Sequence, residues 1–388
     1  MKIANRMENL SPSVTMAITA LARELKAQGK DILSFSAGEP DFDTPEVIKQ
    51  AAIKAIEQGH TKYTAVEGII PTKQAIINKL KRDHNLDYSL ENIVISNGAK
   101  HSLFNLFQVL IEKGDEVIIP APYWVTYPEQ VKYSNGVPVI IQTEDTNNFK
   151  ITAEQLKKAI TEKTKALLIN TPSNPTGAVY TKEELEEIAE VLKGTDILVL
   201  SDEMYEKIMY DGKEFTALAQ ISEDMYQRTI TINGLSKSAA MTGWRFGYLA
   251  TPNTELVKNM IKLQGQVSSN VNSITQYAAI PALEGEADET MEIMRKEFEK
   301  RRNVVVKSFN DIKGLSCFNP DGAFYVFVNI KDISNDSVKF CADLLEQKGV
   351  ALVPGLAFGT EGYLRFSFAT DLKTIEEGIK RIKEFVEK

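Results

Sequence analysis

The feature that most constrains the fold of this chain is a regular alternation of short β-rich runs and helical patterns that starts near Asn92. The apolar and β-branched runs predict strands over residues 93–96, 116–119, 137–141, 165–170, 197–200, 229–233 and 247–250. Between them, residues 100–110 carry apolar side chains at helical spacing, and Thr181 and Glu184 form a capping box that opens a helix over 181–192. Strands that alternate with helices in this way indicate an α/β fold with a mainly parallel sheet covered on both faces.

After Leu283 the pattern changes to that of a smaller α+β unit. Residues 288–309 predict a long charged helix with Lys300, Arg301 and Arg302, which we expect to be a solvated, bridging helix. Further elements are expected as strands 323–329, 349–353 and 363–368 and as helices over 337–348 and from 372 onward. At the start of the chain, a helix over 13–28 is expected to pack with a first strand over 32–35.

Charge and composition exclude several classes of protein. The 388 residues include 45 lysines and arginines against 53 aspartates and glutamates, a net charge of −8, without a long basic run. This acidic balance lacks the electrostatic signature of proteins that bind nucleic acids or anionic membranes. Cys317 and Cys341 are too few for a disulfide framework and lack a zinc-binding spacing, which favours a reducing compartment. With no signal-peptide pattern and no apolar run of about 20 residues, we expect a cytoplasmic protein.

Polar residues directly follow the predicted strands, and in α/β sheets ligands bind outside the carboxyl ends of the strands. Strand 197–200 leads to Asp202, which either caps a following helix or orients a cationic group. Strand 229–233 leads to Ser236 and Lys237. Lys237 is either a surface lysine or an amine held in the cleft, where desolvation would lower its pKa and allow it to form a Schiff base.

Two other strand ends carry candidate binding groups. Strand 165–170 leads into a loop with two prolines and a glycine, in which Asn174 is either a rigidly held hydrogen-bonding group or part of a tight turn. Strand 93–96 leads to Gly98 and Ala99 at the start of a helix. Small residues at a helix N-terminus let an anion approach the free backbone amides.

Other chemistries have little support in the sequence. It contains no GxGxxG, HExxH, GxSxG or Walker A motif. His60, His84 and His101 are too scattered to suggest a metal site, so we expect them to have surface or packing roles. Of the three, His101 lies next to a candidate site residue, Lys100.

Seven motifs in order along the chain resemble those of the class I/II aminotransferases: SAGEPDFDTP at 36–45, KYTAVEG at 62–68, APYWV at 121–125, NPTG at 174–177, SDEMY at 201–205, SKSAAMTGWR at 236–245 and YLRFSFAT at 363–370. The resemblance covers essentially the whole chain. It implies a fold-type-I enzyme that uses pyridoxal 5′-phosphate (PLP), with a large, mainly parallel seven-stranded sheet domain and a smaller α+β domain. The expected division is a large PLP-binding domain of residues 45–283 and a small domain of residues 1–44 and 284–388.

The resemblance also implies roles for the residues that match the family's motifs. Lys237 matches the lysine that binds PLP and moves a proton during catalysis, and Asp202 matches the aspartate that faces the pyridine nitrogen. Tyr205 and Asn174 match the donors to the phenolic oxygen, and Trp124 matches the aromatic residue stacked on the ring. The phosphate is expected to bind Gly98, Ala99, Lys100, Ser236 and Arg245.

The same resemblance places the substrate. Its α-carboxylate is expected at Arg365, because a guanidinium holds a carboxylate as a two-pronged fork that a lysine cannot copy. The backbone of Gly38 is expected close to that carboxylate, with Trp124 and Asn174 beside the substrate.

Two structural expectations follow from the family as well. Tyr63 matches a tyrosine that reaches the phosphate of the other subunit, which implies a homodimer with shared active sites. The family also has cis peptide bonds at positions that match Ala121-Pro122 and Asn174-Pro175.

The opening of the chain favours an acidic substrate. SPSVT at 11–15, followed by a helix, resembles the start of the prokaryotic branch of the aspartate aminotransferases, in which a serine, a threonine and a lysine bind the distal carboxylate. Ser13, Thr15 and Lys100 match them; the alternative is that Ser13 only caps the helix and Lys100 is a surface residue. Another branch uses an arginine beyond the phosphate arginine, and residues 263–282 contain none. The expected reaction converts L-aspartate and 2-oxoglutarate to oxaloacetate and L-glutamate in two half-reactions.

Several alternatives stay open from the sequence. An aminotransferase for aromatic amino acids, prephenate or kynurenine, or a PLP-dependent C–S lyase, would share the same PLP residues. A PLP-binding transcriptional regulator would need a DNA-binding extension, and only a single predicted helix precedes Ser36. A phosphate-binding protein without catalytic activity is the remaining possibility.

Overall fold

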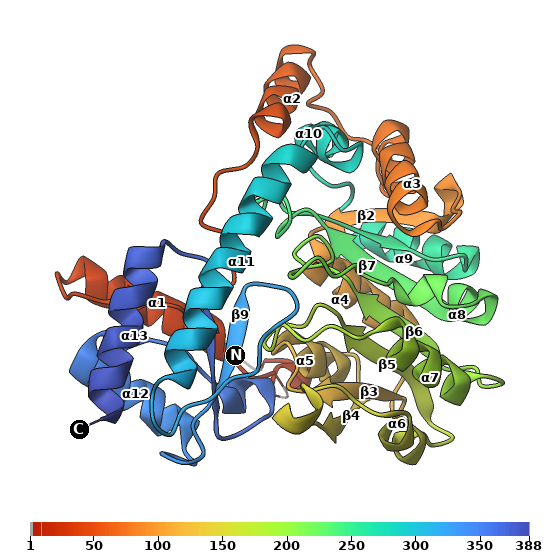
Figure 1. Cartoon of the computed structure of the whole chain (residues 1–388). Coiled ribbons are helices and arrows are strands. Elements are labelled where there is room, and N and C mark those ends of the chain that lie inside the picture. The colour runs from red at the N-terminus through yellow and green to blue at the C-terminus, as the bar shows by residue number, and fades with distance from the viewer. Residues whose placement is uncertain (1–2, 9, 388) are drawn as a thin grey trace.

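The computed structural model describes residues 3–8 and 10–387, and its elements follow the predicted alternation (Figure 1). The α-helices are α1 (Val14–Ala27), α2 (Glu46–Glu57), α3 (Ile70–His84), α4 (Ala99–Leu110), α5 (Thr126–Tyr133), α6 (Ala153–Ala159), α7 (Lys182–Leu192), α8 (Glu223–Arg228), α9 (Thr254–Val267), α10 (Ser273–Leu283), α11 (Asp288–Asn310), α12 (Ser337–Lys348) and α13 (Leu372–Val386). The strands are β1 (Leu33–Ser34), β2 (Ile93–Asn97), β3 (Glu116–Ala121), β4 (Val137–Gln142), β5 (Thr164–Asn170), β6 (Leu198–Asp202), β7 (Thr229–Gly234), β8 (Phe246–Ala250), β9 (Tyr325–Asn329), β10 (Val350–Ala351), β11 (Val353–Pro354) and β12 (Tyr363–Ser367). None of the described helices has the length and apolar character needed to cross a membrane.

The large sheet has seven strands in the order β2-β8-β7-β6-β5-β3-β4. The strands β4, β3, β5, β6 and β7 pair in parallel, and β8 is antiparallel to both of its neighbours, so the prediction of a mainly parallel sheet is confirmed. Strands β7 and β8 are buried along their whole length, as expected for a sheet covered on both faces. The carboxyl ends of β5, β6 and β7 lie next to one another, which brings three of the predicted strand-end segments together.

Two smaller sheets contain the remaining strands. Strands β11, β12 and β9 form an antiparallel sheet, and β1 pairs in parallel with β10. The single strand predicted over 349–353 is therefore two strands. It divides at Leu352 because its first half pairs with β1 and its second half pairs with β12.

The β1–β10 pair joins the two ends of the chain. Leu33 lies opposite Val350, and Ser34 lies opposite Ala351. The side chain of Phe35 stacks on Phe366, with 4.2 Å between the ring centroids. The proposed boundaries at residues 44 and 283 stay predictions, and residues 1, 2, 9 and 388 of the predicted domains lie outside the described residues.

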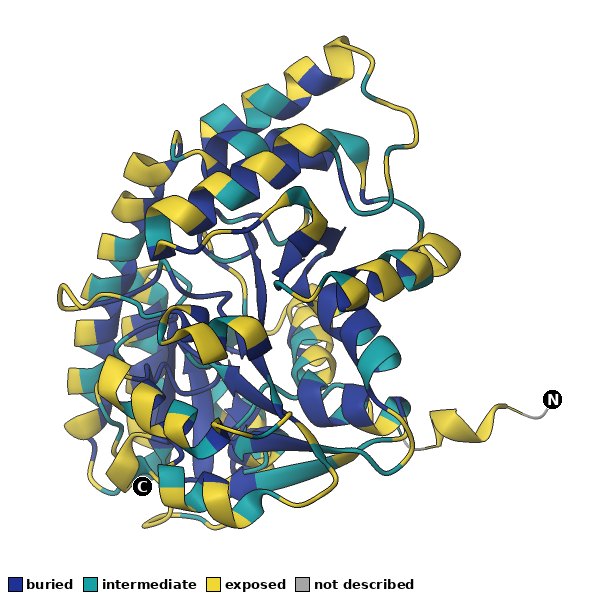
Figure 2. Ribbon diagram, turned by 90° about the vertical axis from the view of Figure 1, so that its right-hand side faces the viewer, coloured by how far each residue is buried: buried dark blue, intermediate teal, exposed yellow. Residues whose placement is uncertain are grey.

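The long helix predicted after Leu283 is α11, which extends from the end of α10 toward the small sheets (Figure 1). The expectation that its basic residues are solvated is wrong for Arg301 and Arg302, which are buried. Arg302 forms a two-pronged ion pair with Asp211, at 2.7 and 3.0 Å. Arg301 donates to Asp41 at 2.7 Å. Figure 2 shows the wider pattern, in which outer helices expose one face and bury the other.

Two X-Pro bonds are cis among the described residues. Ala121-Pro122 is one of them, as predicted, and the other is Thr171-Pro172. The prediction for Asn174-Pro175 is therefore wrong. The loop after β5 contains both Pro172 and Pro175. Every X-Pro bond has a similarly small preference for trans over cis, so the local sequence does not show which of the two bonds is cis.

Candidate active site

A cavity of about 420 Å³ opens where the carboxyl ends of the central strands meet α1 and the small sheets. It is lined by most of the residues predicted for the site: Ser13, Thr15, Gly38, Ala99, Lys100, Trp124, Asn174, Asp202, Tyr205, Ser236, Lys237, Arg245 and Arg365. Residues separated by more than 300 positions in the sequence thus come together in one place. The strand-end argument locates the cavity correctly, because β5, β6 and β7 each deliver a candidate residue to it.

Lys237 follows β7 and extends into the cavity, where its Nζ donates a hydrogen bond to the carbonyl oxygen of Gly38 at 2.5 Å. Its surroundings desolvate the amine and lower its pKa to about 8. The positive charges of Arg365 and Arg245 lower this pKa too, whereas Glu39 and Asp202 raise it. The amine is therefore held close to the pH range in which it can act as a base or a nucleophile.

Asp202 ends β6 and is 4 % exposed. The hydroxyl of Tyr127 donates to its Oδ2 at 2.6 Å, and the backbone amide of Met204 donates to its Oδ1 at 3.2 Å. Burial raises the pKa of Asp202 to about 6, although both hydrogen bonds oppose the shift. No α-helix follows Asp202 directly, so of the two readings from sequence the helix cap is wrong. The carboxylate is instead fixed at the wall of the cavity.

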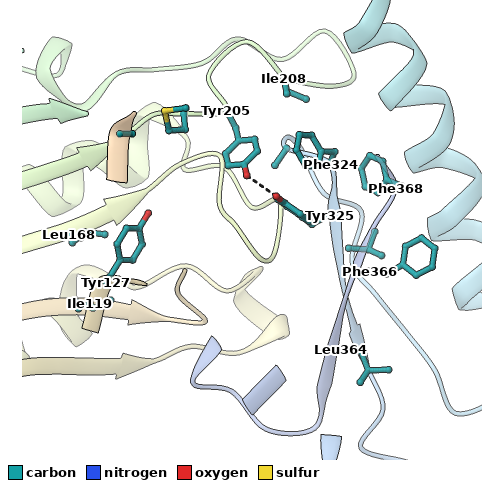
Figure 3. Packing of buried hydrophobic residues seen from close by; sticks show 14 of the residues in the cluster. Ile119, Tyr127, Leu168, Tyr205, Ile208, Phe324, Tyr325, Leu364, Phe366 and Phe368 are labelled. Atoms are coloured by element: carbon teal, nitrogen blue, oxygen red, sulfur yellow. Dashed lines mark hydrogen bonds between the residues drawn. The ribbon is translucent and has the colours of Figure 1, made fainter. Parts of the chain in front are cut away.

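Tyr205 and Asn174 lie near the small-domain side of the cavity. The hydroxyl groups of Tyr205 and Tyr325 are 2.8 Å apart, and Figure 3 shows them facing each other from the turn after β6 and from β9. The side-chain oxygen of Asn174 accepts a hydrogen bond from Arg365 at 2.9 Å. The backbone amide of Asn174 donates to Asn170 at 2.8 Å, which fixes the proline-containing loop.

Arg365 lies on β12 and is 1 % exposed. Besides Asn174, its guanidinium donates to the carbonyl oxygen of Ser36 at 2.5 Å and stands over the rings of Tyr325 and Phe358 at 4.6 and 5.0 Å. Among the described residues, no carboxylate forms an ion pair with Arg365. Burial lowers the pKa of this guanidinium, yet arginine keeps its charge at neutral pH. A buried cation without a counter-ion at the wall of a cavity provides a site for an anionic ligand.

A second part of the cavity wall, at the end of the cavity next to α4, also favours an anion. Helix α4 begins at Ala99, so its free backbone amides point toward this end. Arg245 and Ser236 line the same cavity. Gly98 does not line the cavity itself. Its φ of +81° is a backbone conformation that glycine adopts readily and other residues rarely do. A side chain at this position would collide with the guanidinium of Arg245.

The residues predicted to bind a distal carboxylate line the cavity as well. Ser13 also caps α1, because its side chain accepts a hydrogen bond from the amide of Met16 at 3.4 Å. The Nζ of Lys100 stands 4.8 Å from the centre of the Trp124 ring. Surrounding protein atoms and the nearby Arg245 lower the pKa of Lys100. The capping role of Ser13 is thus present, and it does not prevent the residue from facing the cavity.

Like Gly98, Tyr63 is a predicted site residue that does not line the cavity. Its side chain is 90 % exposed and it is absent from the cavity wall. The predicted role of Tyr63 requires a second subunit. His60, His84 and His101 also lie outside the cavity wall.

Two tyrosines of the site escaped prediction from the sequence. Tyr127 lies on α5, just beyond the carboxyl end of β3, and an extension of the strand-end argument by a few residues finds it. Tyr325 lies inside a predicted strand of the small domain, where nothing in the local pattern points to a ligand. A side chain at Gly38 would come within 2.6 Å of the Tyr325 hydroxyl, so this tyrosine closes the cavity next to Arg365.

The lowered pKa of Lys237 predicts a distinct pH dependence of its reactivity. In the protein without ligand, acetylation of Lys237 should rise with a midpoint near its pKa of about 8. Acetylation of a lysine in a short unstructured peptide, measured alongside as the control, should rise about two pH units higher. Peptide mass spectrometry after short exposure to the reagent at several pH values measures both rates. A midpoint for Lys237 that coincides with that of the peptide lysine would contradict the described environment.

Comparison with known proteins assigns the family. Residues 30–382 match the family described as Aminotransferase class I and II. The aspartate aminotransferases of Bacillus subtilis and Geobacillus stearothermophilus are 50 and 49 % identical to the chain, over 100 % of the chain and 100 and 99 % of their own lengths. The aspartate/prephenate aminotransferase of Nitrosomonas europaea is 46 % identical over 98 % of the chain and 99 % of its own length.

Solved structures agree with this assignment. The aspartate aminotransferase from Rhizobium meliloti has a TM-score of 0.96 at 41 % identity and covers 100 % of the chain and 99 % of its own. The Thermus thermophilus aspartate aminotransferase with maleate has a TM-score of 0.95 at 39 % identity, with 99 % of both chains covered. The chain therefore belongs to the class I and II aminotransferases, a family of PLP-using enzymes that act on amino and keto acids.

Proposed function

We propose that the protein binds PLP at Lys237 and transfers the amino group of L-aspartate to 2-oxoglutarate, which yields oxaloacetate and L-glutamate. The observation that carries the proposal is the layout of one cavity. The amine of Lys237, with its lowered pKa, lines the same cavity as the N-terminus of α4 and the uncompensated cation of Arg365. The names of the relatives, aspartate aminotransferases at about half identity over their full length, support the choice of substrate.

The residues of the cavity suit PLP. The N-terminus of α4, Ser236 and Arg245 would hold its phosphate, and the ring of Trp124 would cover its planar face. Asp202 is a buried carboxylate without an ion pair among the described residues, and it would face the pyridine nitrogen. When bound, PLP supplies an electron-accepting ring that stabilises negative charge at the substrate's α-carbon.

The chain's own residues would supply binding and proton transfer. Arg365 would hold the α-carboxylate, with Asn174 and the carbonyl of Ser36 fixing the guanidinium plane. The Nζ of Lys237 would remove a proton from the substrate and return it at a neighbouring atom, because its pKa of about 8 lets it exist in both protonation states near neutral pH. Tyr127 would keep Asp202 in one orientation through the bond to Oδ2.

Lys100, together with Ser13 and Thr15, would bind the distal carboxylate of aspartate. Replacing Lys100 with alanine should raise KM for aspartate about 10- to 100-fold, as expected for a lost charged hydrogen bond. KM for alanine or phenylalanine should stay within about twofold of the parent value, since these substrates lack that carboxylate. Steady-state kinetics with each donor and 2-oxoglutarate measures the three values.

The exposed Lys132 on α5 serves as the matched control for Lys100. Lys132→Ala also removes one positive charge, but Lys132 does not line the cavity. Its KM values should equal those of the parent. Equal losses for all three donors in Lys100→Ala would contradict the proposed role in binding a distal carboxylate.

A second acceptor is supported by the relatives that are named aspartate/prephenate aminotransferases. Prephenate carries two carboxylates, which Arg365 and Lys100, the cations proposed to bind the two carboxylates of aspartate, would hold. The test is a panel of amino donors and acceptors, prephenate included, with the yellow holoenzyme. Release of pyruvate and ammonia without an acceptor would instead favour a C–S lyase. If the protein stays colourless in the presence of PLP, and borohydride does not fix PLP to Lys237, the proposal as a whole is contradicted.

We also propose that the enzyme works as a cytoplasmic homodimer with shared active sites. Tyr63, highly exposed in the single chain, would reach the phosphate site of the partner subunit. Ile53, Ile56 and Ile70 are exposed apolar side chains on α2 and α3, the helices on either side of Tyr63 in the sequence. Sedimentation equilibrium measures the mass of the particle, and a monomer with full activity would contradict shared sites.

A further inference from the structure

A cluster of ionisable side chains, all buried except the half-buried Asp83, packs against the turn that follows β6. We call it the α3 cluster; it consists of Lys79, Asp83 and His84 on α3 and Glu203 and Glu206 on the turn. Glu206 connects the two elements. Its Oε1 is 2.5 Å from the Nζ of Lys79, and its Oε2 is 2.6 Å from the Nε2 of His84.

The cluster shares a short turn with two residues of the active site. Asp202 and Tyr205 line the cavity, whereas Glu203 and Glu206, the next residue after each of them, do not. The turn is not an α-helix, and backbone hydrogen bonds from Glu203 to Ile232 and from Glu206 to Glu203 are among its ties. The contact of Glu206 with α3 bridges 122 positions of sequence and anchors the turn through a residue that lies outside the cavity wall.

The charges in this cluster are unusual for a protein interior. Lys79 is 4 % exposed and Glu206 is 6 % exposed. Burial alone would raise the pKa of Glu206, but Lys79 and His84 lower it well below the ordinary carboxyl range, so Glu206 is ionised. A buried ion pair rarely stabilises a fold more than apolar side chains of the same size would, whereas it does specify one arrangement of the groups it joins.

The cluster could also suggest a metal site, because Asp83, His84 and Glu206 offer ligand atoms within 4.8 Å of one another. The positive charge that a metal would bring is already present. Lys79 contacts Glu206, and Lys207 contacts Asp83 at 2.8 Å. The geometry therefore favours a tie between two elements over a cation site.

We propose that Glu206 is a positioning residue of the active site: its contacts with Lys79 and His84 fix the turn after β6 and thereby the carboxylate of Asp202 and the hydroxyl of Tyr205. The kinetic part of this inference rests on the proposed aminotransferase function. The structural part concerns the turn alone and can be measured on the protein without cofactor.

The variant Glu206→Gln tests the proposal, because glutamine keeps the size of the side chain and removes its charge. The kcat with aspartate should fall about 10- to 100-fold, as expected when a catalytic group is slightly misplaced. KM should change by less than about threefold, since neither substrate carboxylate binds at the turn. Amide hydrogen exchange of the peptide over residues 198–210, measured without cofactor, should become faster.

The matched control is Glu184→Gln. Glu184 also lies 2.5 Å from a buried lysine, Lys150, but neither residue lines the cavity. This variant should lower Tm and leave kcat and the exchange of residues 198–210 unchanged. If Glu206→Gln changes kcat and exchange no more than Glu184→Gln does, the proposal is wrong.

A second variant separates the effect on the position of the turn from the effect on the stability of the fold. It also replaces Glu206→Gln as the test if that variant does not fold. Lys79→Met/Glu206→Met removes both charges together, so no unpaired ammonium is left buried. Its Tm should recover, while kcat stays low and the turn still exchanges faster than in the parent. Recovery of kcat together with Tm would show a purely structural role and overturn the proposal. If the parent has no aminotransferase activity, the proposed function fails, and the exchange measurement still decides whether Glu206 fixes the turn.

Discussion

Lys237→Ala should abolish amino-group transfer, with turnover about 10⁴-fold or more below that of the parent. The side chain lines the cavity with an amine whose pKa is about 8, so its loss would remove both the proposed attachment point of the cofactor and the proposed proton carrier. Single-turnover absorbance changes with aspartate measure the effect on the half-reaction directly. Lys262→Ala, which removes an exposed lysine, should retain full activity.

The same substitution has an opposite effect on stability, and its sign follows from the pKa. The fold lowers the pKa of Lys237 from 10.5 to about 8, so at neutral pH it must hold a proton that the site disfavours. Relative to the parent apoprotein, Lys237→Ala should therefore gain in Tm at pH 7. This gain should disappear as the pH rises from 8 toward 10.5. In that range Lys237 of the folded parent loses its proton, so the site is neutral in the parent as it is in the variant. The measured quantity is the Tm of Lys237→Ala minus the Tm of the parent. A smaller difference at pH 7 than at pH 10 would contradict this environment.

Arg365→Lys should lower kcat/KM for every amino donor about 10²- to 10³-fold, the loss typical of a buried, hydrogen-bonded charge pair. All donors carry the α-carboxylate, so aspartate, alanine and phenylalanine should lose equally, in contrast to Lys100→Ala. A lysine keeps the charge but cannot reproduce the two contacts that Asn174 and Ser36 impose on the guanidinium plane.

The apoprotein provides the control for Arg365. Because this buried guanidinium has no carboxylate partner among the described residues, Arg365→Met should leave Tm of the apoprotein nearly unchanged or raise it. Maleate, a dicarboxylate without an amino group, should raise Tm of the parent and have a much smaller effect on this variant. Strong stabilisation of Arg365→Met by maleate would contradict the assignment of the α-carboxylate site.

The centre of the candidate site could be predicted from the sequence because parallel strands bring their carboxyl ends together. Asp202 is the last residue of β6 and Lys237 follows β7, so their meeting at one cavity requires only that the two strands be neighbours. Arg365 and Gly38 had to be inferred from the family's motifs. Their place depends on how the small domain packs on the sheet, which local patterns do not encode.

The rest depended on contacts between distant segments. Charge along α11 predicted a solvated helix, but the partners that bury Arg301 and Arg302, Asp41 and Asp211, lie in other parts of the chain. In the same way, the pattern of α3 gave no sign that Lys79 and His84 would meet Glu206. Such buried ion pairs form only when the fold brings together two charged side chains that are far apart in the sequence.

The pairing of the two chain ends has a consequence for how the enzyme folds during its synthesis. Strand β1 pairs with β10, and the carbonyl of Ser36 accepts a bond from Arg365 across 329 positions of sequence. During synthesis, the large sheet can assemble while its lysine-bearing cavity is still open on one side, since the strand that carries Arg365 has not yet left the ribosome. The group proposed to bind the substrate is thus synthesised last. A chain that ends before residue 365 would carry Lys237 without the arginine proposed to bind the substrate's α-carboxylate.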